Sequence, residues 1–325
     1  MAAVKIRTTQ APGVAGGWPA ATDGWRLAGV GCWLCAALVF ALPSPPAQGQ
    51  VSQTPPSEAA SLSDGQMREL FQRVADADLQ NDKKQRNYTY TMHRVEHKLD
   101  TKGQVKSSES KTFEVMELYG EQVRRLVARN DQPLSADDAR KEEAKIQKLV
   151  ARRANESESD RRKRQDKEAK ARDEDRRFVR EVWDAYRFRL AGTESPEGRE
   201  TYVIDGEPRP GYQPHMKEAR ILPKFRFRAW IDKSASQWRK LDIQCIDTVS
   251  FGLVVARLHK GSSIVIEQMR INDEVWLPQH VALKVDARLA LLKNFNLEED
   301  VTFRDYKKFS AETKITPGGE VLRKD

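Results

Sequence analysis

The sequence has few cysteines and few histidines, and these shortages exclude whole classes of protein. Only three cysteines and five histidines occur among its 325 residues. Cys32 and Cys35 fall within the first fifty residues, so a chain trimmed there keeps only Cys245 and has no internal disulfide. The fold must therefore be held together by its hydrophobic core.

Motifs that carry catalytic chemistry are missing as well. The chain contains no glycine-rich phosphate loop and no Gly-x-Ser-x-Gly elbow. His93 and His97 lie on an expected strand, about 13 Å apart along it, which is too far to share one ion. Cys245 follows Leu241 and Ile243 in an apolar alternation typical of a small buried thiol. We expect no enzyme, no cofactor and no metal site.

The first fifty residues have the three parts of an export signal. Lys5, Arg7 and Arg26 give a positive start, residues 27–42 carry no charge, and a small-residue stretch ends at Gly49. The uncharged run is shorter than the roughly 20 residues of a spanning helix. We expect cleavage near Gly49 and a periplasmic protein. An uncleaved N-terminal membrane anchor is the alternative.

The net charge of +8 lies mostly after this leader and is mixed with many acidic residues. A basic excess favours anionic surfaces such as lipid headgroups, so peripheral membrane contact is one expectation. An ordinary soluble surface of mixed charge is the plainer alternative. The chain lacks a dense basic and aromatic patch, so we expect no nucleic-acid partner.

Composition divides the chain into four parts. Residues 1–49 form the signal peptide, and residues 50–62 are a flexible linker rich in Pro, Ser and Gln. Residues 63–310 are expected to form one domain, and residues 311–325 a loose tail. The prediction is thus a single domain behind a leader.

A charged helical insertion at 135–182 interrupts this domain. Ser135 is suited to cap a helix, and nearly every residue from 156 to 177 is charged, with opposite charges at helical spacing. Two interpretations remain open: a solvated helix, or an arm that docks on an envelope protein.

An amphipathic helix is predicted at the start of the domain. Ser63 or Asp64 can cap it, and its apolar residues repeat at spacings of three and four. They are Met67, Leu70, Phe71 and Val74. A single helix must bury such a stripe against something larger.

Most of the remaining domain alternates apolar and polar residues between short turns, which predicts strands. The predicted strands are 87–99, 111–118, 122–128, 186–191, 199–205, 225–232, 238–246, 251–258, 263–271, 275–289 and 296–309. Consecutive strands without helices between them favour an antiparallel meander. A strand of residues 275–289 reaches about 50 Å, so we expect the sheet to twist and curl, as a barrel or around helices.

Four segments carry a resemblance to a known family: residues 225–232, 250–258, 272–278 and 301–309. With the export signal and the first helix, they make the chain resemble the LolA-like superfamily. These exported proteins, which include outer-membrane lipoprotein carriers and the lipid-sensing part of RseB, have a half-open β-barrel closed by helices. The resemblance implies an α+β fold with a curled antiparallel sheet and an apolar cavity for acyl chains. The charged insertion departs from the short carriers.

Eight strand residues are candidates to line the implied cavity: Phe225, Phe227, Ile231, Leu241, Ile243, Leu283, Val285 and Phe303. Met67, Leu70, Phe71 and Val74 would form a lid over them. Burial contributes about 0.8 kcal/mol per methylene, so such a cavity could extract an acyl chain without covalent chemistry. The alternative is that these residues are ordinary core. Arg226 and Arg228 should lie on the opposite face.

Two functions follow from these expectations. The first is a non-catalytic periplasmic carrier that binds a lipid or an acylated lipoprotein. The alternative is a protein-interaction or sensory module of a cell-envelope complex without lipid cargo, which makes contact through the charged helix. A hydrolase ranks third, because the sequence shows no polar cluster suited to it.

Overall fold

The computed structural model describes residues 62–119, 121–251, 256–289, 293–309, 314–315 and 321–322. The predicted signal peptide, the possible anchor and nearly all of the linker lie outside these residues. In the described part of the chain, no helix combines the length and the hydropathy needed to cross a membrane.

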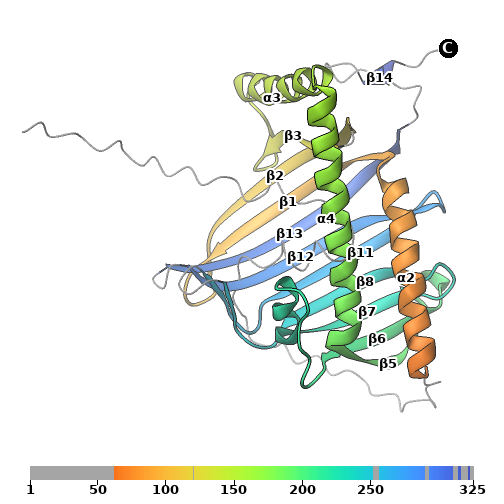
Figure 1. Cartoon of the computed structure of the whole chain (residues 1–325). Coiled ribbons are helices and arrows are strands. Elements are labelled where there is room, and N and C mark those ends of the chain that lie inside the picture. The colour runs from red at the N-terminus through yellow and green to blue at the C-terminus, as the bar shows by residue number, and fades with distance from the viewer. Residues whose placement is uncertain are drawn as a thin grey trace, which may run out of the picture.

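The fold of the described residues is α+β: one helix precedes the first four strands, and two more helices separate these from the remaining strands (Figure 1). The helices are α2 (Asp64–Gln85), α3 (Ala136–Ala154) and α4 (Glu158–Ala185), with short 3-10 turns η1 (Pro196–Gly198) and η2 (Glu218–Lys224). The strands before η2 are β1 (Tyr88–Leu99), β2 (Val105–Leu118), β3 (Glu121–Arg129), β4 (Gln132–Pro133), β5 (Tyr186–Glu194) and β6 (Thr201–Pro208). Those after it are β7 (Phe225–Asp232), β8 (Gln237–Cys245), β9 (Val249–Phe251), β10 (Ala256–Leu258), β11 (Ser263–Ile271), β12 (Val275–Leu289), β13 (Lys293–Lys308), β14 (Lys314–Ile315) and β15 (Val321–Leu322).

One antiparallel sheet organises the domain, in the order β4-β3-β2-β1-β13-β12-β11-β8-β7-β6-β5. Strand β10 pairs with β12 and β9 beside this path. Most neighbours are consecutive in the chain, which confirms the predicted meander. The pairing of β1 with β13, which sets Met92 opposite Phe303, joins the two ends of the domain.

The strand predictions are accurate where alternation is clean and wrong where it is not. Strands β7, β11 and β12 have the predicted bounds. The single strand predicted at 251–258 is instead two short strands, β9 and β10, that pair with each other. Strand β2 begins six residues earlier than expected, since polar residues such as Lys106 can still pair on a solvent-exposed strand.

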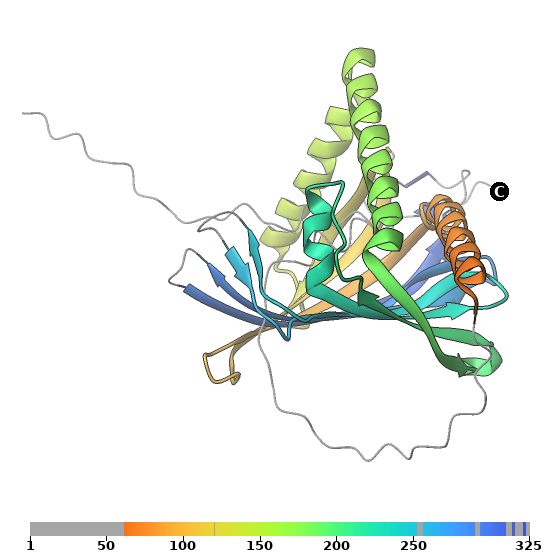
Figure 2. The ribbon, with the colours of Figure 1, turned by 60° about the horizontal axis from the view of Figure 1, so that its bottom comes forward.

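The sheet has two chemically different faces. Helices α2 and α4 lie over one of them, here called the inner face, and no described helix covers the other (Figure 2). The outer face carries cross-strand ion pairs such as Lys240–Glu267, at 2.8 Å. An antiparallel sheet with one face packed and one solvated produces the alternation seen in the sequence.

The sheet is open and not strongly curled, which corrects the expected half-open barrel. Its edge strands, β4 with β3 on one side and β5 on the other, do not pair with each other. The long strands β12 and β13 are accommodated by the twist of the sheet. The apolar face is covered by helices, whereas a barrel would cover it by curling the sheet around it.

Helix α2 begins where the sequence places it, at a capping box between Ser63 and Gln66. Met67, Leu70 and Val74 are buried against the sheet. The helix runs on to Gln85, well past the apolar residues that predict it, and its last turns make hydrogen bonds to the sheet.

The charged insertion is two helices rather than one. The Ser135 side chain caps α3 by accepting from the Asp138 N–H, and Ser157 caps α4 in the same way through Asp160. The chain turns between the two helices at Asn155.

Candidate binding face beneath helix α4

All eight predicted lining residues lie on the inner face, in one apolar cluster with the four predicted lid residues of α2. Ile231 and Val285 are almost fully buried, whereas Phe227 and Leu241 are half-buried. The structure therefore brings the predicted set together.

The apolar side chains form rows that cross the sheet from strand to strand. One row passes from Phe227 to Ile243, then to Ile264 on β11 and Leu283 on β12. The next residue in this row, on β13, is Glu299. This row is therefore apolar from β7 to β12 and becomes charged at β13.

Polar side chains fix the second half of α2 to the sheet. Asn81, which is buried, donates to the Trp276 carbonyl at 2.8 Å and accepts from the Trp276 N–H at 2.7 Å. Asp78 accepts from the indole of Trp238 at 3.0 Å and from the amide of Gln237 at 3.1 Å. Desolvation raises the pKa of Asp78 in spite of these two bonds. The second half of α2, which follows the predicted lid residues, is therefore a fixed part of the fold.

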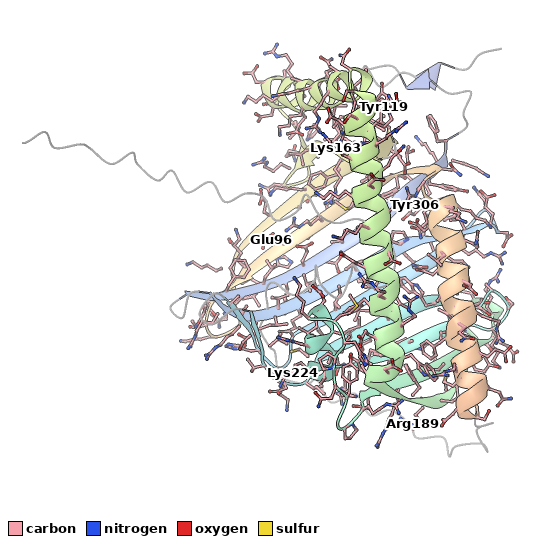
Figure 3. All side chains as sticks on the ribbon, viewed as in Figure 1. Glu96, Tyr119, Lys163, Arg189, Lys224 and Tyr306 are labelled. Atoms are coloured by element: carbon pink, nitrogen blue, oxygen red, sulfur yellow. The ribbon has the colours of Figure 1, made fainter. Side chains whose placement is uncertain are left out.

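Helix α4 crosses the inner face and is held at its two ends. At the first end, the Arg164 guanidinium donates to the Tyr119 carbonyl at 3.5 Å and pairs with Glu156 at 2.8 Å. At the other end Phe178 is buried, and Trp183 stacks on Phe188 of β5 with ring centroids 4.9 Å apart. Figure 3 shows these two ends near Tyr119 and Arg189, which belong to opposite edges of the sheet.

The middle of α4, residues 165–177, is the segment here called the strap. Its sequence contains no apolar residue larger than alanine, and each of its side chains that the structure describes is exposed. A helix of 28 residues is about 42 Å long, close to the roughly 48 Å width of eleven paired strands. Helix α4 is therefore long enough to span the sheet, and the described side chains of its strap are exposed to solvent.

A loop near residues 209–216 is fastened to the last turns of α4. Glu181, buried on α4, accepts from the Tyr212 hydroxyl and from the His215 N–H, the latter at 3.0 Å. Burial and the neighbouring Glu181 carboxylate raise the pKa of Tyr212. This contact closes the side of the face beside η2.

A charged cluster on the inner face was missed in the sequence. Arg94 on β1 pairs with Glu299 on β13 at 2.8 Å and also with Glu96. Burial raises the pKa of Glu299, although Arg94 opposes the shift. Alternation could have revealed the cluster, since Arg94 and Glu96 have the same parity as buried Met92.

The remaining candidates have structural roles. Arg226 and Arg228 lie on the outer face, where they contact Gln244 and Asp205. The Cys245 thiol is buried, and this raises its pKa to about 11. Within the described ranges, no three His, Cys, Asp or Glu residues are grouped so as to hold a metal ion.

The geometry defines a class: an open antiparallel sheet whose apolar face is crossed by two helices. The sequence matches no known family model, and no curated protein matches it. The solved structures that it matches include a putative outer membrane lipoprotein-sorting protein domain from Vibrio parahaemolyticus (10% identity, TM-score 0.32). That match covers 75% of this chain and 94% of the other.

Two further matches cover a similar share of the chain. A LolA superfamily protein from Nitrosomonas europaea has 8% identity and a TM-score of 0.23, over 75% of this chain and 93% of the other. MucB, solved in complex with the periplasmic part of MucA, has 11% identity and a TM-score of 0.21, over 75% and 99%. A protein of the superfamily expected from the sequence is thus among the solved structures that this chain matches.

Proposed function

We propose that this protein is an exported, non-catalytic carrier that binds the acyl chains of a lipid or of an acylated protein. The chains would lie on the inner face beneath the strap. One observation carries the proposal: a continuous apolar face is crossed by a helix that has no apolar side chain larger than alanine over residues 165–177. A helix evolved only to cover a core would present an apolar stripe.

The energetics favour acyl chains as the occupant. A chain of about 16 carbons gains on the order of 12 kcal/mol when its methylenes leave water. That gain is comparable with the roughly 4–15 kcal/mol that association costs. Because the gain and the cost are similar, tight binding needs a protein surface that is already apolar, and the inner face is such a surface.

Binding requires a movement of the covering helices. Val281, Leu283 and Val285 are buried in the structure described, so an acyl chain has to displace what covers them. The strap is the element suited to move, because each of its described side chains is exposed and none of its residues is apolar and larger than alanine.

The test is to express the chain with its leader, purify it from the periplasm without detergent, and record its native mass. We expect a stoichiometric lipid that solvent extraction releases. Leu241→Asp, which puts a charge on the half-buried inner face, should reduce the bound lipid, whereas Arg226→Asp on the outer face should not. A lipid-free mass that stays unchanged after incubation with envelope lipids would reject the carrier.

A second candidate is an interaction module of the cell envelope. It is favoured by helices α3 and α4, each of which has a serine cap and exposes most of its described side chains. MucB, one of the matched structures, was solved bound to the periplasmic part of MucA. A photo-cross-linker at exposed Lys163 should then capture one envelope protein, and a linker at Lys102 in the β1–β2 turn should not.

A further inference from the structure

The inner face changes from apolar to charged along neighbouring rows. In one row Ile264 and Leu283 are followed by Glu299, Glu96 and Glu109. In the next row Val281 and Val301 are followed by Arg94, Lys111 and Arg129. The change occurs at β13 in the first row and at β1 in the second, so these two rows share a boundary between apolar and charged residues. Figure 3 shows Glu96 on the charged side of it.

The charged residues are linked into one network, here called the inner charged patch. It consists of Arg94, Glu96, Lys98, Glu109, Lys111 and Glu299. Lys98 lies 3.5 Å from the Glu96 carboxylate, and Lys111 lies 2.8 Å from Glu109. Arg129 adds a further cation 3.8 Å from Glu109. Including Arg129, basic groups outnumber acidic ones in this network.

The patch is costly to maintain as a purely structural feature. The Glu299 side chain is only 7% exposed, and removing an ion from water costs several kcal/mol. The Nε of Arg94 is buried without a hydrogen-bond partner. Arg94 uses Nη2 for both carboxylates, so Nε is a donor with nothing to donate to. Lys98, by contrast, is 55% exposed.

We propose that the inner charged patch binds the headgroup of an acidic amphiphile, a lipid ending in a phosphate or a carboxylate. This inference rests on the proposed function, since the acyl chain of the same ligand would lie along the apolar rows. The headgroup oxygens accept from Arg94 Nε and from the Lys98 ammonium. Arg94 has a spare donor, and its guanidinium and the Lys98 ammonium both reach the Glu96 carboxylate between them. Two such cationic groups suit an anion, because hydrogen bonds between charged groups are the strong ones.

The test compares amphiphiles with the same twelve-carbon tail and different heads. The full-length exported protein, stripped of lipid, is titrated with dodecyl phosphate, dodecanoate and neutral dodecyl maltoside below their micelle concentrations, followed by tryptophan fluorescence. We expect the two anions to bind about tenfold more tightly than the maltoside. The relative strength of dodecyl phosphate and dodecanoate then identifies the preferred acid.

Variants separate the headgroup site from the acyl site. Arg94→Gln should abolish the preference for anions and leave maltoside binding unchanged. Because that change strands two carboxylates, Lys98→Gln serves as a second variant on an exposed residue, with an expected loss of about threefold. Arg228→Gln, on the outer face, is the control and should have no effect.

Each outcome is decisive. Equal binding of all three amphiphiles, or a preference that survives in both Arg94→Gln and Lys98→Gln, overturns the headgroup site while the carrier function stands. Binding of none of the three rejects the carrier function, and the headgroup site falls with it.

Discussion

Gly206 on β6 shows how closely the inner face is packed. A Cβ added there would overlap the ring of Phe227, the neighbouring residue on β7. We expect Gly206→Ala to destabilise the fold by about 1–3 kcal/mol, because one extra methyl must shift a packed aromatic ring. Urea unfolding of the purified protein measures this change.

Gly192 on β5 is the matched control. A Cβ at that position meets no atom within 4 Å, so Gly192→Ala should change stability little. Equal effects of the two substitutions would contradict the close approach of Gly206 and Phe227.

Cys245 gives a second test at this scale. Burial raises its thiol pKa to about 11, so little thiolate exists at pH 8 and the side chain is shielded. We expect iodoacetamide to label the cleaved, folded protein slowly at pH 8 and to label it completely in urea. Rapid labelling of the folded protein would show that the thiol is accessible.

Asp78 links pH to stability. Desolvation raises its pKa, so the folded state keeps the proton to a higher pH than the unfolded state, whose carboxyl titrates near 3.9. Stability from this group is therefore present at low pH and is lost as pH rises through the folded pKa. In Asp78→Asn the side-chain oxygen can still accept from Trp238 and Gln237. We expect a higher Tm than wild type at pH 8, with the gap closing towards pH 4.

Residue alternation predicts much of the inner face but not its exceptions. It placed the eight candidate lining residues, from Phe225 on β7 to Phe303 on β13, on the same face of the sheet, because alternate residues of a strand point to the same face. It did not reveal Arg94 and Glu299 as partners, since they pair across strands 205 positions apart in the sequence. A strand's neighbours are a property of the fold, not of the strand's own residues.

Among the elements, α2 is the clearest case of a helix predicted at its start and missed at its end. Apolar spacing and the Ser63 cap predict the first half. The second half depends on Asn81 and Gln85, which look like surface residues until the Trp276 backbone is beside them.

The contribution of that half can be measured with Asn81→Ala. The substitution leaves the Trp276 N–H unpaired, while the Trp276 carbonyl keeps the bond from Gln85. We expect a loss of about 2–3 kcal/mol in unfolding free energy, because a buried donor is left unsatisfied. Gln80→Ala, on the exposed side of the same helix, should remain within about 0.5 kcal/mol of wild type.

On the scale of the whole molecule, the open sheet could not be deduced from the strands alone. Their lengths required twist, which both a barrel and an open sheet supply. The helical insertion favours the open sheet, because its second helix, α4, crosses the sheet from the β3 edge to β5. Composition predicted that the insertion is helical but gave no sign of where it lies.

The pairing of β1 with β13 predicts how truncations behave. A chain that ends at residue 292 lacks β13, which is the one strand that joins β1, β2 and β3 to the rest of the main sheet in the part of the chain that the structure describes. We expect it to show no cooperative unfolding by circular dichroism. A chain that ends at residue 309 keeps β13 and should unfold like the full protein.

That same pairing has a consequence for how the protein is made. Thr89 lies opposite Lys307, so the centre of the sheet cannot be completed until almost the entire chain has left the ribosome. Sheets that depend on pairing between distant parts of the chain form slowly, because the entropy of closing the long loop is lost before the new contacts stabilise the sheet. A chain that stays unfolded during synthesis is suited to threading through a narrow translocation channel, and it would complete its fold on the far side.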